Sequence, residues 1–161
     1  MALKQAVWNS MLDADMNARY WRYLVTRYSK RDTNFKIFLA IMASTTVAGW
    51  GIWDQYEFIW KGLSSLSALC AIALPILNYP KTIESMSELA GKWGELRIEY
   101  EDMWLDVRNT PDSKTLVKTY KKFRATEISL AKKESKMPNE KKLLKKCFEE
   151  VKQSRGLKRG K

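Results

Sequence analysis

Two long stretches without a charged side chain constrain this chain more than any other feature of its sequence. The first runs from Ile37 to Trp53 and the second from Gly62 to Pro80. The charged residues between them are Asp54, Glu57 and Lys61. Helices of this length measure about 26–28 Å, close to the roughly 30 Å hydrocarbon core of a bilayer. The pattern predicts a transmembrane helical hairpin, because helices buried in a bundle usually keep a polar face.

The residues at the ends of the runs indicate an orientation in the membrane. Tryptophan and tyrosine favour membrane interfaces, and Trp50, Trp53, Trp60 and Tyr79 lie near the run ends. The connecting segment carries Lys61 as its one basic residue, whereas several lysines and arginines lie before and after the pair of runs. The positive-inside rule then places both termini in the cytoplasm, and we expect no signal peptide.

Helical periodicity covers most of the remaining chain. Apolar residues in steps of three and four predict an amphipathic helix over residues 3–30, with a cap or break at Asp32–Asn34. A coiled-coil-like seam follows the hairpin, and it packs either on the N-terminal helix or between subunits. The seam consists of Met86, Leu89, Trp93, Leu96, Tyr100, Met103 and Val107.

The predicted fold class is therefore all-α, a membrane helical hairpin with long amphipathic cytoplasmic helices, assembled as an oligomer. We expect five parts: an N-terminal amphipathic helix in residues 1–34, the hairpin in 35–80, the heptad-patterned helix in 81–110, further helices in 111–153 and a basic disordered tail in 154–161.

The net charge of +11 is concentrated at the two ends of the chain. Residues 1–36 hold seven basic and three acidic side chains, and residues 132–161 hold twelve and four. The segment between them holds ten basic and eleven acidic residues. Contact with the lipid bilayer explains such basic ends, and an anionic ligand such as a nucleotide or oligonucleotide is the sharper alternative.

Basic residues alternate with aromatic residues in two places, around Tyr20 and around Tyr120. Guanidinium and ammonium groups hold phosphate, and aromatic rings stack on bases. Amphipathic helices that lie near lipid give the same pattern, so both interpretations stay open. The candidate nucleotide-binding residues are Arg19, Arg22, Lys118, Lys121, Lys122 and Arg124.

The apolar runs carry hydroxyl groups but no ionisable residue deep within them. A proton relay or a coupled transporter would need such a residue. The hydroxyl groups either allow close helix packing or line a water-filled pore built from several hairpins. The candidate pore-lining residues are Ser44, Thr45, Ser64 and Ser67.

Signatures of catalysis are missing from the sequence. The chain has no histidine, and its two cysteines, Cys70 and Cys147, lie far apart in sequence. There is also no glycine-rich phosphate loop and no nucleophile in a recognisable setting. We therefore expect neither an enzyme nor a cofactor or metal site.

The order of the parts is similar to that of the SLATT family of bacterial defence proteins. The matching segments are Leu3–Lys30, Phe35–Trp53, Phe58–Tyr79 and Ile83–Val107. The resemblance implies an oligomeric pore-forming effector of antiphage defence, a multi-pass protein of the bacterial inner membrane. Its cytoplasmic basic helices would respond to a nucleotide or oligonucleotide signal from a partner nucleotidyltransferase, and membrane disruption would arrest growth. A phage holin-like pore former without a ligand and a non-conducting membrane scaffold are the alternatives.

Overall fold

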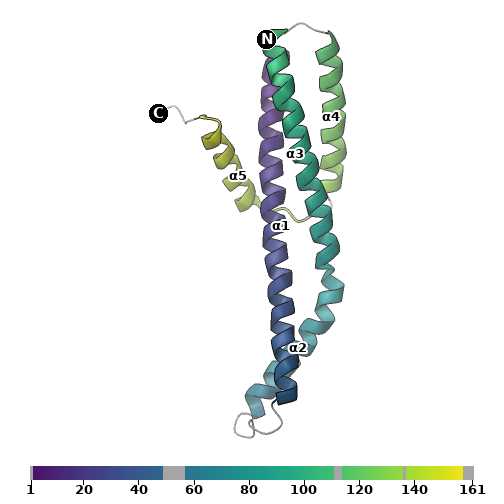
Figure 1. The fold of residues 1–161 in the computed structure, drawn as a ribbon, viewed down its shortest axis with the longest axis vertical. Coiled ribbons are helices and arrows are strands. Elements are labelled where there is room, and N and C mark those ends of the chain that lie inside the picture. The colour runs from purple at the N-terminus through teal and green to yellow at the C-terminus, as the bar shows by residue number, and fades with distance from the viewer. Residues whose placement is uncertain (1, 49–56, 111–113, 136, 158–161) are drawn as a thin grey trace. The chain divides into compact units, whose positions relative to one another are not determined.

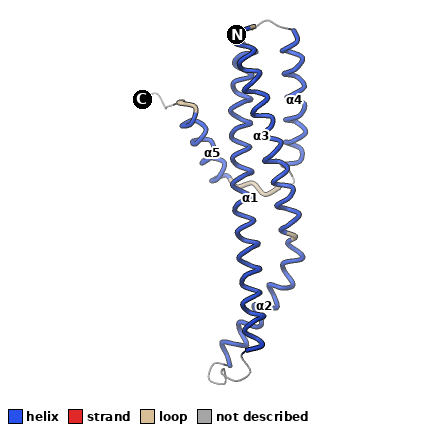
Figure 2. The backbone as a smooth tube through the Cα atoms, in the orientation of Figure 1, coloured by secondary structure: helices blue, strands red, loops and turns tan. Residues whose placement is uncertain are grey.

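The computed structural model describes residues 2–48, 57–110, 114–135 and 137–157, and helices account for most of them (Figures 1 and 2). No strand occurs in this described part of the chain, so the prediction of an all-α fold is confirmed. The helices are α1 (Ala2–Ala48), α2 (Glu57–Leu77), α3 (Tyr79–Asn109), α4 (Lys114–Glu134) and α5 (Lys141–Ser154).

The chain divides into two compact units. The bundle unit comprises Met1–Leu24 and Met86–Lys161, and the hairpin unit comprises Val25–Ser85. The bundle unit therefore contains the first half of α1, most of α3, and all of α4 and α5. All the predicted nucleotide-binding residues belong to this unit.

The core of the bundle unit is built on the predicted apolar stripe of α3. All seven of its positions, from Met86 to Val107, are buried within one chain. Rings of α1 and α3 also meet directly, because Trp8 and Trp104 lie 5.0 Å apart between centroids. The other helices contribute Val7, Met11, Ala14, Ala18, Trp21 and Leu24 from α1, Leu130 from α4, and Leu143, Cys147 and Val151 from α5.

The first helix continues through the segment where the sequence predicts a cap or break. Asp32 and Lys36 form an ion pair one turn apart, with 2.6 Å between Nζ and Oδ2. The Arg31 guanidinium lies over the Tyr28 ring, 5.6 Å from its centroid. Pairs at this spacing support a helix through residues of modest helix propensity such as Asn34. The helix is therefore 47 residues long instead of ending near residue 30.

The prediction of a membrane hairpin is wrong for the described chain. Among the residues that the structure describes, no helix is both long enough and apolar enough to cross a bilayer. The uncharged part of α1 is twelve residues, Ile37–Ala48, and that of α2 is sixteen, Gly62–Leu77. A transmembrane helix needs about 20. The second stretch ends early because Asn78 takes a φ of +42° and separates α2 from α3. The turn at Asp54 lies outside the described residues.

This finding also overturns the expectations that depend on the hairpin. A multi-pass location in the bacterial inner membrane and an ion channel both require membrane-spanning helices, and the described chain has none. Neither of them is therefore proposed.

The fifth helix ends in a Schellman motif. Gly156 has a φ of +69°, and its N–H donates to the Gln153 carbonyl at 3.2 Å. The Leu157 N–H donates to the Lys152 carbonyl at 2.8 Å. Both bonds satisfy carbonyls that a helix end leaves open. The motif fixes the backbone of Arg155, in a segment where the sequence predicts a disordered tail. Residues 158–161 of that tail lie outside the described residues.

Replacing Gly156 tests the Schellman motif. Gly156→Ala should lower the free energy of unfolding by about 1–2 kcal/mol, because alanine is strained in the left-handed conformation. Gly94→Ala is the matched control, since a Cβ added at this position in α3 meets nothing within 4 Å. The control should raise the free energy of unfolding by about 0.5–1 kcal/mol. Urea unfolding followed by circular dichroism measures both changes, and a stabilising Gly156→Ala would contradict the motif.

Candidate functional site

Arg19 lies in an ionic network that joins α1 to α3 and to the end of α5. Its guanidinium donates to both carboxylate oxygens of Asp15, from Nε at 2.8 Å and from Nη2 at 3.2 Å. Nη2 also donates to Ser154 Oγ at 3.1 Å. Arg155 Nη2 lies 3.4 Å from Asp15 Oδ2 and contacts the Glu101 carboxylate. Arg19 therefore already pairs with a carboxylate of the protein itself, and its role in ligand binding stays a prediction.

The charge of Asp15 is held inside this network. Its side chain is only 5% exposed. Burial alone would raise the pKa of Asp15, but the Arg19 hydrogen bond and charge, with the charges of Arg155 and Arg97, lower it below 3.8. The hydrogen bond to Asp15 in turn raises the pKa of Arg19. Bidentate arginine–carboxylate pairs are among the stronger polar contacts, so this network fixes the end of α5 to α1.

The neighbouring aromatic and basic residues of α1 also hold α5. The Tyr23 hydroxyl donates to Glu150 at 3.0 Å, and Lys146 Nζ lies 4.5 Å from the centroid of the Tyr23 ring. Arg22 is exposed on α1 but already has an interaction of its own. The first predicted cluster is therefore mainly a contact between helices.

The second predicted cluster divides between the two faces of α4, and Arg124 belongs to the inner contacts. Arg124 contacts Glu127, whose Oε1 accepts a hydrogen bond from the Tyr100 hydroxyl at 2.6 Å. The Tyr100 ring packs edge-to-face on Phe123, with 5.4 Å between centroids. Burial raises the pKa of Tyr100, and the bond to Glu127 raises it further, so the hydroxyl remains a donor.

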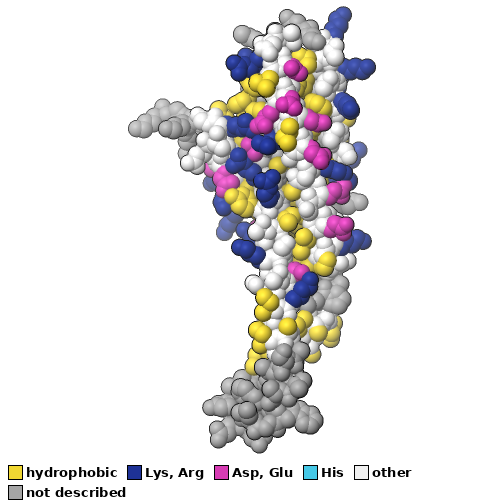
Figure 3. All heavy atoms as spheres, viewed as in Figure 1, with side chains coloured by type: hydrophobic (Ala, Val, Ile, Leu, Met, Phe, Trp, Pro, Cys, Tyr) yellow, Lys and Arg dark blue, Asp and Glu magenta, His cyan; other side chains and the backbone are white. Residues whose placement is uncertain are grey.

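The lysines of this cluster lie on the outer face of α4. Lys118, Lys121 and Lys122 are exposed, and none of them pairs with a carboxylate of the described chain. Each residue advances about 100° around the helix axis, so these three lysines lie within an arc of about 100° of the helix surface. Lys114 and Lys132 lie within the same arc. Figure 3 shows lysine and arginine side chains projecting along α4. The structure therefore brings together three of the six predicted ligand-binding residues, in a row with two further lysines.

Both acidic residues of α4 point inward. Glu127 is only 8% exposed. Glu134 Oε1 accepts a hydrogen bond from Trp21 Nε1 at 2.6 Å and another from Trp93 Nε1 at 2.5 Å. The helix Lys114–Glu134 holds seven basic and two acidic residues. Because both acids are bound on the inner side, the outer face carries the unbalanced positive charge.

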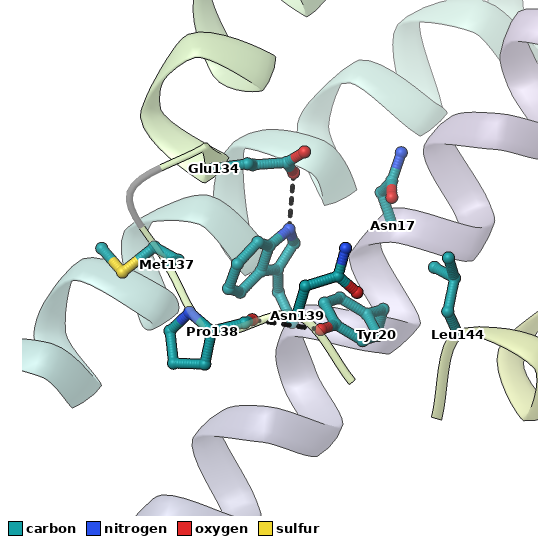
Figure 4. Close-up of a pocket in the computed structure, with 8 residues that line it drawn as sticks. Asn17, Tyr20, Glu134, Met137, Pro138, Asn139 and Leu144 are labelled. Carbon is teal, nitrogen blue, oxygen red and sulfur yellow. Dashed lines mark hydrogen bonds between the residues drawn. The ribbon is translucent and has the colours of Figure 1, made fainter. Parts of the chain in front are cut away.

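A cleft of about 140 Å³ lies beside Glu134, where α4 connects to α5 (Figure 4). The Tyr20 hydroxyl fixes the connecting segment, because it donates to the Pro138 carbonyl at 3.3 Å and accepts from the Glu140 N–H at 2.9 Å. Asn139 lines the other side of the cleft. Sequence reasoning missed this site, because its residues come from two segments more than 110 positions apart and no local motif joins them.

The structure describes the side chains of two of the four predicted pore-lining residues. Ser64 and Ser67 are half-buried on α2. The side chains of Ser44 and Thr45 lie outside the described residues. A pore-lining role depends on membrane spans, which the described helices do not provide, so we do not carry it further. Within the described chain, no group of three His, Cys, Asp or Glu side chains could hold a metal ion.

The Asp15 network predicts a specific loss of stability in acid. A carboxylate with a lowered folded-state pKa stabilises the fold above its ordinary value of 3.8, and this contribution is lost as the pH falls through the folded-state pKa. Asp15→Asn should therefore be less stable at neutral pH, by about 1–3 kcal/mol, and should lose less stability below about pH 4. Urea unfolding across this pH range measures both effects.

Asp13→Asn is the matched control on the same helix. Burial raises the pKa of Asp13 against the lowering charge of Arg124, so its ionisation disfavours the fold. This variant should be more stable at neutral pH and should lose stability more steeply in acid. The same pH dependence in both variants would contradict the assignment of opposite roles to the two carboxylates.

Comparisons with known proteins identified no relative of this chain. No protein-family model, no curated protein and no solved structure matches the chain. The resemblance to the SLATT family therefore stays a prediction that rests on the order of the sequence parts, and a role in antiphage defence gains no support from relatives. Function must be inferred from the geometry of the chain itself.

Proposed function

We propose that the bundle unit binds the phosphates of a nucleotide or a short oligonucleotide on the outer face of α4. One observation carries this proposal: five lysines share one arc of the helix without a partner in the described chain, while both acids of that helix are held on the opposite side. Lys114 and Lys132 are about 27 Å apart along the helix axis. A row of this length can contact several phosphates.

The row differs from an ordinary solvated face in its lack of compensating acids. Exposed helical lysines commonly alternate with acids one turn away. Lys92 of α3 shows that pattern, because its Nζ lies 2.5 Å from Glu88, one turn earlier in the same helix. None of the five lysines of the row has an acid one turn away in the sequence, and none pairs with a carboxylate of the described chain. Their positive charges repel one another, and an anionic ligand would relieve that repulsion.

The rings expected to stack on bases are not available on this face. Tyr120 is turned inward, and its hydroxyl lies 3.2 Å from Ser10 Oγ of α1. Phe123 packs on Tyr100. The row therefore contacts phosphate without reading base sequence, and its affinity depends strongly on salt.

A groove between α3 and α4 lies beside the lysine row, and its charged lining residues are Lys92, Glu95 and Glu99 of α3 and Lys133 of α4. Lys92 and Lys133 both pair with Glu88, whereas Glu95 and Glu99 form no ion pair within the described chain. These two carboxylates therefore disfavour a phosphate inside the groove and confine the ligand to the outer face of α4. The proposed path of the ligand is therefore narrow, as it would be for a single strand rather than a duplex. A homo-oligomer and a partner nucleotidyltransferase stay predictions that no observation tests.

Charge reversal on the row tests the proposed function. The triple variant Lys118→Glu, Lys121→Glu, Lys122→Glu should bind a labelled single-stranded oligoadenylate of about twelve nucleotides about tenfold or more weakly. Fluorescence anisotropy at several salt concentrations measures the affinity. The slope of log affinity against log salt should become shallower by about 2, since about 0.7 counterions are released per phosphate contact with a single strand.

A control variant separates this surface from net charge. Lys30, Lys81 and Arg108 are exposed and lie outside α4, so reversing them makes the same change in total charge. The control triple should retain most of the affinity and the slope of the wild-type chain. An equal loss in both triple variants would mean that net charge, and not the α4 face, determines binding.

A further inference from the structure

The cleft beside Glu134 lies at one end of the lysine row. Glu134 is the last residue of α4 and follows Lys132 by two positions. Across the cleft, Asn139 is separated by Glu140 from Lys141 and Lys142, the exposed lysines that begin α5. The lysines of the α4 row project from the face opposite to Glu134, so Lys141 and Lys142 of α5 are the positive side chains that follow the cleft on its own side.

The cleft offers polar groups whose capacity for hydrogen bonds is not used. Glu134 Oε1 is occupied by the Trp21 and Trp93 indole N–H groups, but Oε2 has no hydrogen bond within the described chain. The side-chain amides of Asn17 and Asn139 have no hydrogen-bond partner there either. Figure 4 shows both amides and the Glu134 carboxylate around the same space. The cleft thus combines one free carboxylate oxygen with two free amides.

The size and walls of the cleft favour one small, flat ligand. Its volume of about 140 Å³ is close to the roughly 150 Å³ of a cavity that holds one benzene molecule. Drug-sized ligands occupy pockets of about 300 Å³ or more. Tyr20 and Trp21 form a rigid wall, because both are at most 5% exposed and their rings pack edge-to-face at 5.2 Å between centroids.

We propose that this cleft binds an amino-substituted nucleobase, adenine or cytosine, whose own phosphate contacts the lysines that begin α5, while the rest of the strand follows the lysine row of α4. This inference rests on the proposed function. The exocyclic amine of the base donates to Glu134 Oε2, and a ring nitrogen accepts from the amide of Asn17 or Asn139. Carboxylates and amides recognise these base edges in nucleic-acid complexes.

The other bases fit the same groups less well. Uracil places a carbonyl oxygen where adenine and cytosine carry the amine, so it meets the Glu134 carboxylate with like partial charge. Guanine presents two adjacent donors, whereas Glu134 has one oxygen free. The cleft therefore adds base selectivity, which the lysine row does not supply.

Calorimetric titration of the full chain with single nucleotides tests the cleft. AMP or CMP should bind about tenfold or more tightly than UMP and ribose 5-phosphate, the expected effect of one hydrogen bond to a charged group. Glu134→Gln should reverse this preference. The glutamine oxygen still accepts from both indoles, while its NH₂ group replaces the free carboxylate oxygen and donates to the uracil carbonyl. A merely structural role of Glu134 would leave the preference unchanged.

Asn139→Ala provides a second variant at an exposed position. It should weaken AMP or CMP binding, and the affinity for ribose 5-phosphate should not change. Equal affinity for all four ligands, with oligoadenylate binding still dependent on the α4 lysines, would overturn the cleft and leave the phosphate surface intact. No binding of oligoadenylate or of any single ligand would overturn the proposed function itself.

Discussion

The arrangement of the bundle unit depends on two carboxylates bound by aromatic donors. Trp93 and Tyr100 are members of the apolar stripe of α3 and lie one heptad apart. Glu134 and Glu127 of α4 are also one heptad apart, and they accept from Trp93 and Tyr100 respectively. From the first pair to the second, the residue number rises along α3 and falls along α4, so the two helices are antiparallel. The two bonds together fix the register between them. A shift by one residue would leave both carboxylates without their aromatic donors, at the cost of polar groups in the interface without hydrogen bonds.

The same two bonds account for the charge distribution on which the proposed function depends. A carboxylate on an outer helix face would pair with lysines one turn away and neutralise them. Turning both acids of α4 inward removes that competition, so the lysine row from Lys114 to Lys132 stays unpaired within the described chain. The aromatic stripe of α3 therefore does more than fill the core, because its N–H and O–H groups determine which face of α4 is cationic.

Sequence pattern was sufficient for the apolar stripe but not for the polar contacts. The three–four spacing of Met86 to Val107 identifies buried positions because burial follows helical periodicity. Arg19 and Arg124, both predicted to bind a ligand, pair with Asp15 and Glu127, and the helical spacing of each pair was a local sign of that contact. The contact of Glu134 with Trp21 and Trp93 had no such sign, since it joins three helices.

The apolar runs were misread for a related physical reason. Periodicity describes the faces of a helix, but it does not determine where a helix ends. Lys61 and the positive φ of Asn78 bound the uncharged part of α2, and a count of uncharged residues continues to Pro80. Large apolar side chains of both runs, Ile41 and Leu69 among them, are exposed in the hairpin unit rather than packed in its core.

Glu134 connects the register of the bundle to the proposed base site. One of its oxygens binds α1 and α3 through two indoles, and the other is open to the cleft. A carboxylate held so firmly cannot turn away from a ligand, so little conformational entropy remains to be lost on binding. By linkage, a ligand that binds the folded carboxylate also stabilises the contacts that orient it. Occupation of the proposed site would therefore strengthen the α3–α4 register, and with it the alignment of the lysine row that contacts the phosphates.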